Sequence, residues 1–182
     1  MKKTKITRTA SIVGIIAIAA MIGFSLAACG DDGGGGNQYA DFNAVIATLT
    51  PGDPPNEELT PFNGISLSSI WSTIKSTAGG NYRGWGKDGT DLEVIFTGTT
   101  KAKYDALKTM ATDGNMVDYT SNVFGVSEFT SNGLTGKVYK DDDTVLGFVL
   151  VYSSGGSHPN LADGIAIPSG VIYISFDTDV TD

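Results

Sequence analysis

The sequence has very little cysteine and histidine, the residue types that most often bind transition metals or supply a nucleophile and its base. It contains one of each in 182 residues, Cys29 and His158. One cysteine cannot form an internal disulfide, and one histidine excludes a multi-histidine zinc or iron site. We therefore expect a domain that folds without disulfides and binds no cofactor or transition metal.

Basic residues are also scarce, and four of them stand in the first eight positions. The chain has 12 Lys and Arg against 20 Asp and Glu, a formal net charge of −8. Without residues 1–28, which hold four basic and no acidic residues, the balance is 8 against 20, or −12. Phosphate backbones repel so acidic a surface. We therefore expect no nucleic-acid partner, and a charge that keeps the domain soluble.

The sequence also lacks the nucleophile motif of serine hydrolases. It contains no Gly-x-Ser-x-Gly, and its only histidine follows Ser157 directly, a spacing at which two side chains rarely meet. We interpret His158 as a solvated loop residue and predict that the protein is not an enzyme. The alternative is a cell-envelope hydrolase that uses Asp or Glu carboxylates, although the sequence does not indicate which two would act together.

The N-terminal segment carries the most specific pattern of the chain. After the basic start, residues 10–26 form an uncharged apolar run that is too short to span a membrane comfortably, and Leu26-Ala27-Ala28-Cys29 closes it. This order resembles the signal peptide of bacterial lipoproteins, whose lipobox has Leu three positions before the cysteine and small residues between. The alternatives are an ordinary signal peptide and a buried helix with an incidental cysteine.

The lipoprotein resemblance implies an anchor and a compartment. Residues 1–28 would be the signal peptide, and Cys29 would be lipidated on its sulfur, for instance with palmitate, and begin the mature chain. The anchor and a Gly-rich tether occupy residues 29–40, which would let a domain stand about 15 Å from the bilayer. We expect a bacterial cell membrane or outer membrane location, with the domain in the periplasm or outside the cell.

Residues 41–182 are expected to form one globular domain with three helices. Asp41 caps a short helix, a proline-rich connection over residues 50–61 follows and is expected to be exposed, and Ser66 begins a second helix that Gly79 and Gly80 end. Thr99 or Thr100 caps the third helix. On the second helix, Trp71 belongs to the apolar stripe and is expected in the core.

The remaining pattern predicts strands. Residues 92–96, 123–129, 137–139, 145–152 and 171–176 have β character, and residues 81–89 are expected to be a turn-rich segment before the first of them. Residues 144–152 are apolar on both faces, which indicates a central strand. The predicted fold class is α+β, a two-layer arrangement of an antiparallel sheet with helices packed on one face.

The stretch from residue 90 to about 152 is also similar to a repeat-type domain of uncharacterised bacterial lipoproteins. A strand over residues 92–96 leads to Tyr104-Asp105-Ala106-Leu107 and then to Tyr139-Lys140-Asp141-Asp142. The resemblance implies an uncharacterised domain of this kind and no catalytic residues.

Two aromatic residues are candidate binding residues. Glycines flank Trp85, and Tyr82, Arg83 and Asp88 stand nearby, a combination that suits a carbohydrate or peptide platform. The alternative is that Tyr82 and Trp85 fill the end of the sheet. We predict a non-enzymatic binding or interaction module with a protein or glycan ligand.

Clustered carboxylates leave a third function open, a calcium-stabilised adhesion module. Asp141, Asp142 and Asp143 lie in a predicted hairpin, and Asp177 and Asp179 precede the C-terminal Asp182. Their spacing matches no twelve-residue calcium loop. We interpret both clusters as solvated charges and predict no metal site.

Overall fold

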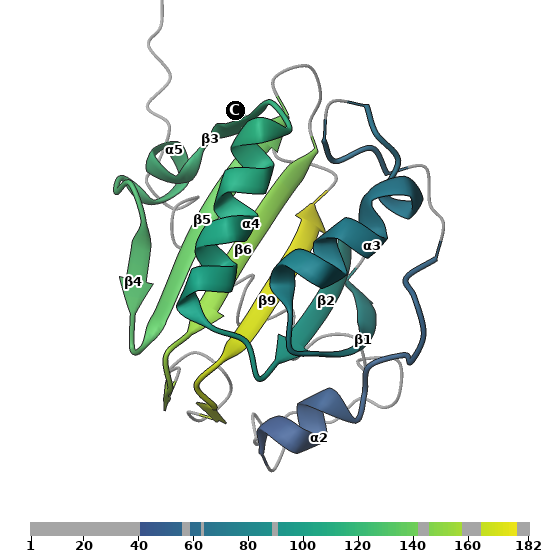
Figure 1. Cartoon of the computed structure of the whole chain (residues 1–182). Helices are drawn as coiled ribbons and strands as arrows, with labels where there is room; N and C mark the ends of the chain where they lie inside the picture. Colours follow the sequence, from purple (N-terminus) through teal and green to yellow (C-terminus); the bar gives the residue numbers. More distant parts are fainter. Residues whose placement is uncertain are drawn as a thin grey trace, which may run out of the picture.

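One antiparallel sheet organises the part of the chain that the structure describes. The computed structural model describes residues 41–55, 59–62, 64–88, 91–141, 146–157 and 165–177. Within these residues seven strands follow the order β1-β2-β9-β6-β5-β3, with β4 also beside β5 (Figure 1). The strands of this sheet are β1 (Asn81–Asp88), β2 (Asp91–Thr97), β3 (Met116–Asp118), β4 (Phe129–Ser131), β5 (Leu134–Asp141), β6 (Gly147–Ser153) and β9 (Val171–Asp177). A separate pair joins β7 (Gly156–Ser157) to β8 (Ala166–Ile167).

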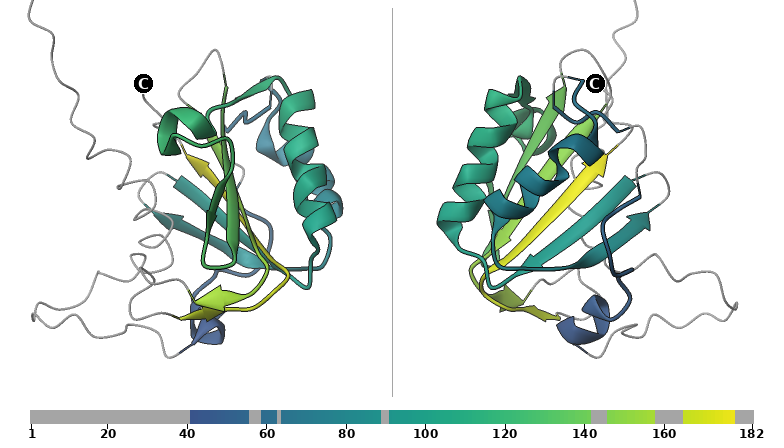
Figure 2. Two further views of the ribbon diagram at one scale, coloured as in Figure 1. Left: turned by 90° about the vertical axis from the view of Figure 1, so that its left-hand side faces the viewer. Right: turned by 45° about the vertical axis from the view of Figure 1, so that its right-hand side comes forward.

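Two long helices form the second layer. The helices α3 (Leu67–Ala78) and α4 (Lys101–Asp113) pack on the same face of the sheet, as the edge-on view in Figure 2 shows. The α+β, two-layer prediction is confirmed. The short helices α2 (Phe42–Ile46) and α5 (Thr120–Phe124) instead contribute to the apolar cluster on the opposite face, where Phe42 and Val45 are buried.

The helices begin at the residues that the sequence indicates. The side chains of Asp41, Ser66 and Thr100 each accept a hydrogen bond from the backbone N–H three residues on, at the starts of α2, α3 and α4. Gly79 ends α3 with a positive φ of 62°. Polar side chains therefore satisfy backbone N–H groups that the first helical turn leaves without partners.

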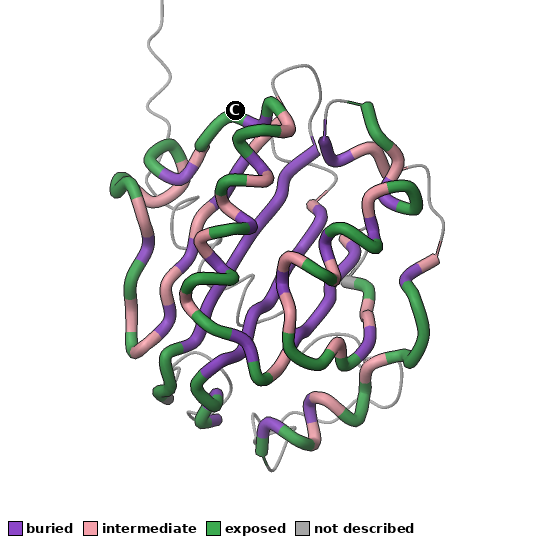
Figure 3. Tube along the Cα trace, viewed as in Figure 1, coloured by how far each residue is buried: buried purple, intermediate pink, exposed green. Residues whose placement is uncertain are grey.

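The centre of the sheet is buried on both faces. Strands β6 and β9 lie between the β1–β2 pair and β5, and nearly all of their residues are buried (Figure 3). Phe148 and Leu150 of β6 belong to the cluster beneath α3 and α4, and Val149 and Val151 belong to the opposite cluster. The prediction of a central strand over residues 144–152 is confirmed, because period-two alternation here supplies apolar side chains to both faces.

Two predicted segments are wrong. Residues 81–89 were expected to be a turn-rich lead, but β1 pairs with β2 along its whole length, so its glycines are held by backbone hydrogen bonds. Residues 123–129 were expected to be a strand, yet helix α5 reaches Phe124 and β4 begins only at Phe129. In both places the packing of the segment against the rest of the sheet outweighs its local propensity.

Other predictions of the sequence fall outside the described residues. The signal peptide, the tether and Cys29 lie there, and so do His158, Asp142, Asp143, Asp179 and Asp182. Among the helices that the structure describes, none is long and apolar enough to cross a membrane.

Candidate functional site

The candidate site lies beneath residues 50–55, here called the proline loop. Thr50 exchanges two backbone hydrogen bonds with Trp85 of β1, with N···O distances of 2.8 and 3.0 Å. The Tyr82 hydroxyl donates to the Gly52 carbonyl oxygen at 3.0 Å. Because proline also fixes the backbone at three of its six positions, this loop has few alternative conformations.

The predicted exposure of the proline-rich connection is therefore only partly right. Residues 51–53 are exposed, but Pro54 and Pro61 are buried. The ring of Pro54 faces the helix layer together with Leu67 of α3.

Helix α3 supplies the other wall of the site. Ser68 and Trp71 are three residues apart and Lys75 is four further on, so the helical period sets them along one side of α3. The Lys75 Nζ atom donates to Asp53 Oδ1 at 2.7 Å and lies 5.7 Å from the centre of the Trp71 ring. This ion pair connects the proline loop to the last turn of α3.

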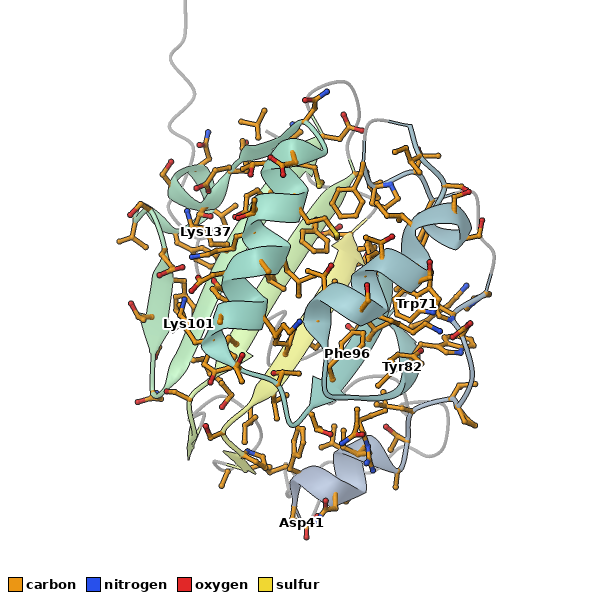
Figure 4. The ribbon with its side chains drawn as sticks, in the orientation of Figure 1. Asp41, Trp71, Tyr82, Phe96, Lys101 and Lys137 are labelled. Atoms are coloured by element: carbon orange, nitrogen blue, oxygen red, sulfur yellow. The ribbon has the colours of Figure 1, made fainter. Side chains whose placement is uncertain are left out.

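Trp71 is buried in the core and also faces the loop. Its side chain is 5% exposed, and its ring meets Tyr82 edge-on at 5.2 Å and Phe96 at 6.2 Å between centroids. The three labelled rings gather where α3 crosses β1 and β2 (Figure 4). The prediction that Trp71 belongs to the core is confirmed.

The indole nitrogen of Trp71 is the unusual polar atom of this site. Nε1 is completely buried, and none of the described residues accepts a hydrogen bond from it. An indole N–H is a donor only, and leaving one unpaired costs about 1–3 kcal/mol. The same N–H interacts with the Asp53 carboxylate and lowers the pKa of that group, although the contact lacks the geometry of a hydrogen bond.

Asp53 and Trp71 both line a hollow of about 90 Å³. Its walls are apolar where the prolines, Leu67 and the indole face it, and polar at Ser68 and the Asp53 carboxylate. The lining residues are Asp53, Pro54, Pro55, Leu67, Ser68 and Trp71.

The electrostatics of the hollow are set by Asp53 and Lys75. The hydrogen bond from Lys75, and after it the Trp71 indole, lowers the pKa of Asp53, which is therefore ionised at neutral pH. Burial, and next the negative charge of Asp53, raises the pKa of Tyr82. The hollow is thus lined by a carboxylate whose charge Lys75 compensates and which can accept a further hydrogen bond.

The two aromatic candidates from the sequence lie beside this hollow. Tyr82 and Trp85 are half-buried and pack against the cluster beneath the helices. Side chains three apart in a regular strand point to opposite faces, but the register shifts between Tyr82 and Gly84, so both reach the helix-covered face. The Tyr82 hydroxyl donates a hydrogen bond to the proline loop, and the backbone of Trp85 is hydrogen-bonded to Thr50 at its start.

A second buried polar group lies on the opposite face of the sheet. Glu93 of β2 pairs across the strands with Ser175 of β9, and both are buried, as is the neighbouring Tyr173. Burial, and next the negative charge of Glu93, raises the pKa of Tyr173. A buried carboxylate beside two hydroxyl groups is an arrangement that a carboxylate hydrolase could use.

Asp141 and Asp177, the described members of the two acidic clusters, come to one end of the sheet. Strand β5 ends at Asp141 and β9 ends at Asp177, while β2 begins at Asp91, which places these three positions at the same end. In the described part of the chain, however, no three His, Cys, Asp or Glu residues lie close enough to hold a metal ion.

Asp53 and Ser68 are the lining residues that the sequence analysis did not select. The run Pro-Gly-Asp-Pro-Pro was a signal that a carboxylate sits in a rigid loop. The sequence could not indicate which helix that loop packs against.

Comparison with protein-family models, curated proteins and solved structures found no match to this chain.

Proposed function

We propose that the protein is a lipid-anchored, non-enzymatic binding module of the bacterial cell envelope, held through Cys29 and contacting its ligand at the hollow beneath the proline loop. The anchor is supported by Leu26-Ala27-Ala28-Cys29 behind a basic start and an apolar run. The location follows from the same motif: membrane-attached, with the domain in the periplasm or outside the cell.

The observation that carries the binding role is the hollow of about 90 Å³ that the ionised Asp53 carboxylate lines together with apolar side chains, Trp71 among them. A carboxylate has about four lone-pair sites, so Asp53 can accept a hydrogen bond from a ligand besides the one that it accepts from Lys75. The proline loop and α3 hold the carboxylate and the apolar wall in place before a ligand arrives, so binding loses little conformational freedom.

A capture experiment with envelope extract tests this function. The tagged full chain and its Trp71→Phe variant would be incubated with extract, and bound glycans and proteins identified. We expect at least one component that the wild type retains and the variant loses. Equal retention of every component by both proteins would contradict binding at the hollow.

The second candidate is a hydrolase, and the observation in its favour is the buried Glu93 beside Tyr173. The full chain would be screened against glycoside, peptide and ester substrates together with the near-isosteric variant Glu93→Gln. Turnover by the wild type that the variant loses would overturn the non-enzymatic proposal. Absence of turnover in both supports it.

A further inference from the structure

We propose that the hollow beneath the proline loop binds the guanidinium group of an arginine side chain from another polypeptide, with the Asp53 carboxylate as its main acceptor. This inference rests on the proposed binding function and names the chemical class of its ligand.

The lining of the hollow offers mainly hydrogen-bond acceptors. Pro54 and Pro55 have no backbone N–H, so their main chain can only accept. The ionised Asp53 carboxylate also accepts only, and the hydroxyl oxygen of Ser68 has lone pairs as well. A complementary ligand therefore donates hydrogen bonds, and an anionic group would be repelled.

Two N–H groups of the lining residues cannot serve a ligand. The Leu67 N–H already donates to the Leu59 carbonyl oxygen at 2.7 Å. Trp71 Nε1 is completely buried, so a ligand does not reach it. These features favour a group that only donates. A guanidinium group carries five N–H donors and no acceptor, whereas a hydroxyl is an acceptor as well as a donor.

Asp53 has the capacity for a second cation. Among the described residues its one cationic partner is Lys75, which contacts Oδ1, and the Asp53 side chain is 61% exposed. Asp105 shows that one carboxylate can pair with two cations, because its Oδ1 atom receives the Nζ atoms of Lys101 at 2.9 Å and Lys108 at 2.8 Å. A second cation at Asp53 would repeat an arrangement that this molecule already contains.

The size and the apolar wall of the hollow suit the end of one arginine side chain. Pockets that enclose a whole drug-sized ligand measure roughly 300–1,000 Å³, whereas this hollow measures about 90 Å³. The methylene stem of an arginine can pack on Pro54, Pro55 and Leu67 while its charged end reaches Asp53. A guanidinium group is more weakly hydrated than an ammonium group, so it loses less on entering. We therefore infer arginine rather than lysine.

The charge of the whole chain favours a basic polypeptide as the source of this arginine. The chain has a formal net charge of −8, which attracts a basic partner over distance. At Trp85 of β1, both the N–H and the C=O are already bonded to Thr50. A partner therefore cannot add a strand to the sheet at this point, and recognition there depends on side chains.

Nuclear magnetic resonance of the ¹⁵N-labelled full chain, in a nonionic detergent without a sugar headgroup, tests the proposal. The Ser68 amide and the Trp71 indole report on the hollow, and the Gly125 amide, beyond the opposite edge of the sheet, is the reference. The probe is the acetylated tripeptide Gly-Arg-Gly amide. Its matched comparisons carry lysine or citrulline, the uncharged analogue of arginine, in the central position. Methyl glucoside is the saccharide comparison.

We expect the arginine peptide to shift the Ser68 and Trp71 signals in a saturable way and to bind more tightly than the lysine and citrulline peptides. Asp53→Asn is expected to weaken its binding at least tenfold, because a hydrogen bond to a charged acceptor is lost. Asp113→Asn removes the same charge from the exposed end of α4 and is expected to leave binding nearly unchanged. Lys75→Gln removes the competing ammonium group and is expected to strengthen binding about threefold.

Several results would overturn the proposal. Unmoved Ser68 and Trp71 signals, or equal affinity for the arginine and citrulline peptides, would remove the cationic ligand, and equal affinity for the lysine peptide would remove the guanidinium. Saturable shifts caused by methyl glucoside alone would assign the hollow to saccharides.

The variants provide a further check. Equal weakening in Asp53→Asn and Asp113→Asn would show general attraction by the acidic surface and no site at the hollow. Weaker binding in Lys75→Gln would contradict competition between two cations for Asp53. The amide spectrum of each variant shows whether it keeps the fold. In each case the capture experiment still decides independently whether the protein is a binding module.

Discussion

At the scale of single residues, Gly133 shows how closely two backbones approach. It has a φ of +79°, and a Cβ atom there would lie 2.1 Å from the carbonyl oxygen of Gly155. Gly125 has a similar φ of +72°, but open space surrounds its Cβ position. Comparing substitutions at these two glycines therefore separates the loss of stability from a left-handed backbone from the loss of stability from a steric clash.

We expect Gly125→Ala to lower the free energy of unfolding by about 1 kcal/mol, from backbone strain alone. Gly133→Ala is expected to cost about 1–3 kcal/mol more, because the Gly155 backbone must move. Urea unfolding of both variants measures the difference. Equal losses would contradict the close approach of residues 133 and 155.

Buried tyrosines give the protein a sensitivity to alkaline pH. Burial is the largest cause that raises the pKa of Tyr82, Tyr104, Tyr139 and Tyr173 above 10.0, and nearby carboxylates add to it. A group whose pKa is higher in the folded state stabilises the fold below its unfolded pKa. That contribution is lost as the pH rises from about 10 toward the folded-state values.

We therefore expect the free energy of unfolding to fall above about pH 10. In a spectrophotometric titration, these four of the seven tyrosines should ionise only as the protein unfolds. Circular dichroism recorded on the same samples locates unfolding. If these four tyrosines ionised near pH 10 while the fold persisted, the burial of their hydroxyl groups would be contradicted.

At the scale of elements, helix α5 completes the outer edge of β5. Strand β4 pairs with β5 up to Gly136 and β3 pairs from Tyr139, which leaves Lys137 and Val138 between them. The Thr120 hydroxyl donates to the Val138 carbonyl at 3.2 Å and accepts from the Val138 N–H at 3.0 Å. The Thr120 side chain thus forms the hydrogen bonds to Val138 that a residue of a neighbouring strand would otherwise form.

We expect Thr120→Val to cost about 1–3 kcal/mol, because the Val138 N–H is left buried without this acceptor. Thr120→Ser keeps the hydroxyl and loses one methyl group, a cost of about 1 kcal/mol. Urea unfolding and hydrogen exchange at the Val138 amide measure both effects. A valine variant as stable as the serine variant would contradict the bridging role of Thr120.

The sequence predicts best those elements whose own residue pattern determines their secondary structure. Caps at Ser66 and Thr100 and an apolar stripe mark α3 and α4, and continuous apolar runs mark β6 and β9. Strand β1 and helix α5 were not predicted. The glycine-rich sequence of β1 forms a strand, and the Thr120 hydroxyl holds α5 in place, only because a neighbouring strand supplies the hydrogen-bond partners.

The candidate site was predicted only in part for the same reason. Tyr82 and Trp85 were selected from their glycine-rich surroundings, and both lie beside the hollow. Asp53 and Trp71 became a pair only through the packing of the proline loop on α3. The bulge at Arg83, which brings Tyr82 and Trp85 to one face, leaves no mark in the sequence pattern.

At the scale of the whole molecule, the described sheet and helices form two apolar clusters, one on each face. All the elements that build them lie within residues 41–177. A Gly-rich tether is expected to add no packing contacts to the domain. We therefore expect the chain without residues 1–28 to fold in the cytoplasm, with the same urea midpoint of unfolding as the full chain. Side-by-side unfolding of this chain and the full chain measures it, and a clearly lower midpoint would contradict the independence of the domain.

The central claim is that a domain of this fold is displayed on a membrane by a lipid at Cys29. Cells that produce the wild type or Cys29→Ser would be grown with a clickable fatty acid, and the proteins compared on a gel. We predict that the wild type is labelled and processed, while Cys29→Ser is unlabelled and keeps the size of the precursor. Label retained by Cys29→Ser, or absent from the wild type, would contradict the anchor and the location that follows from it.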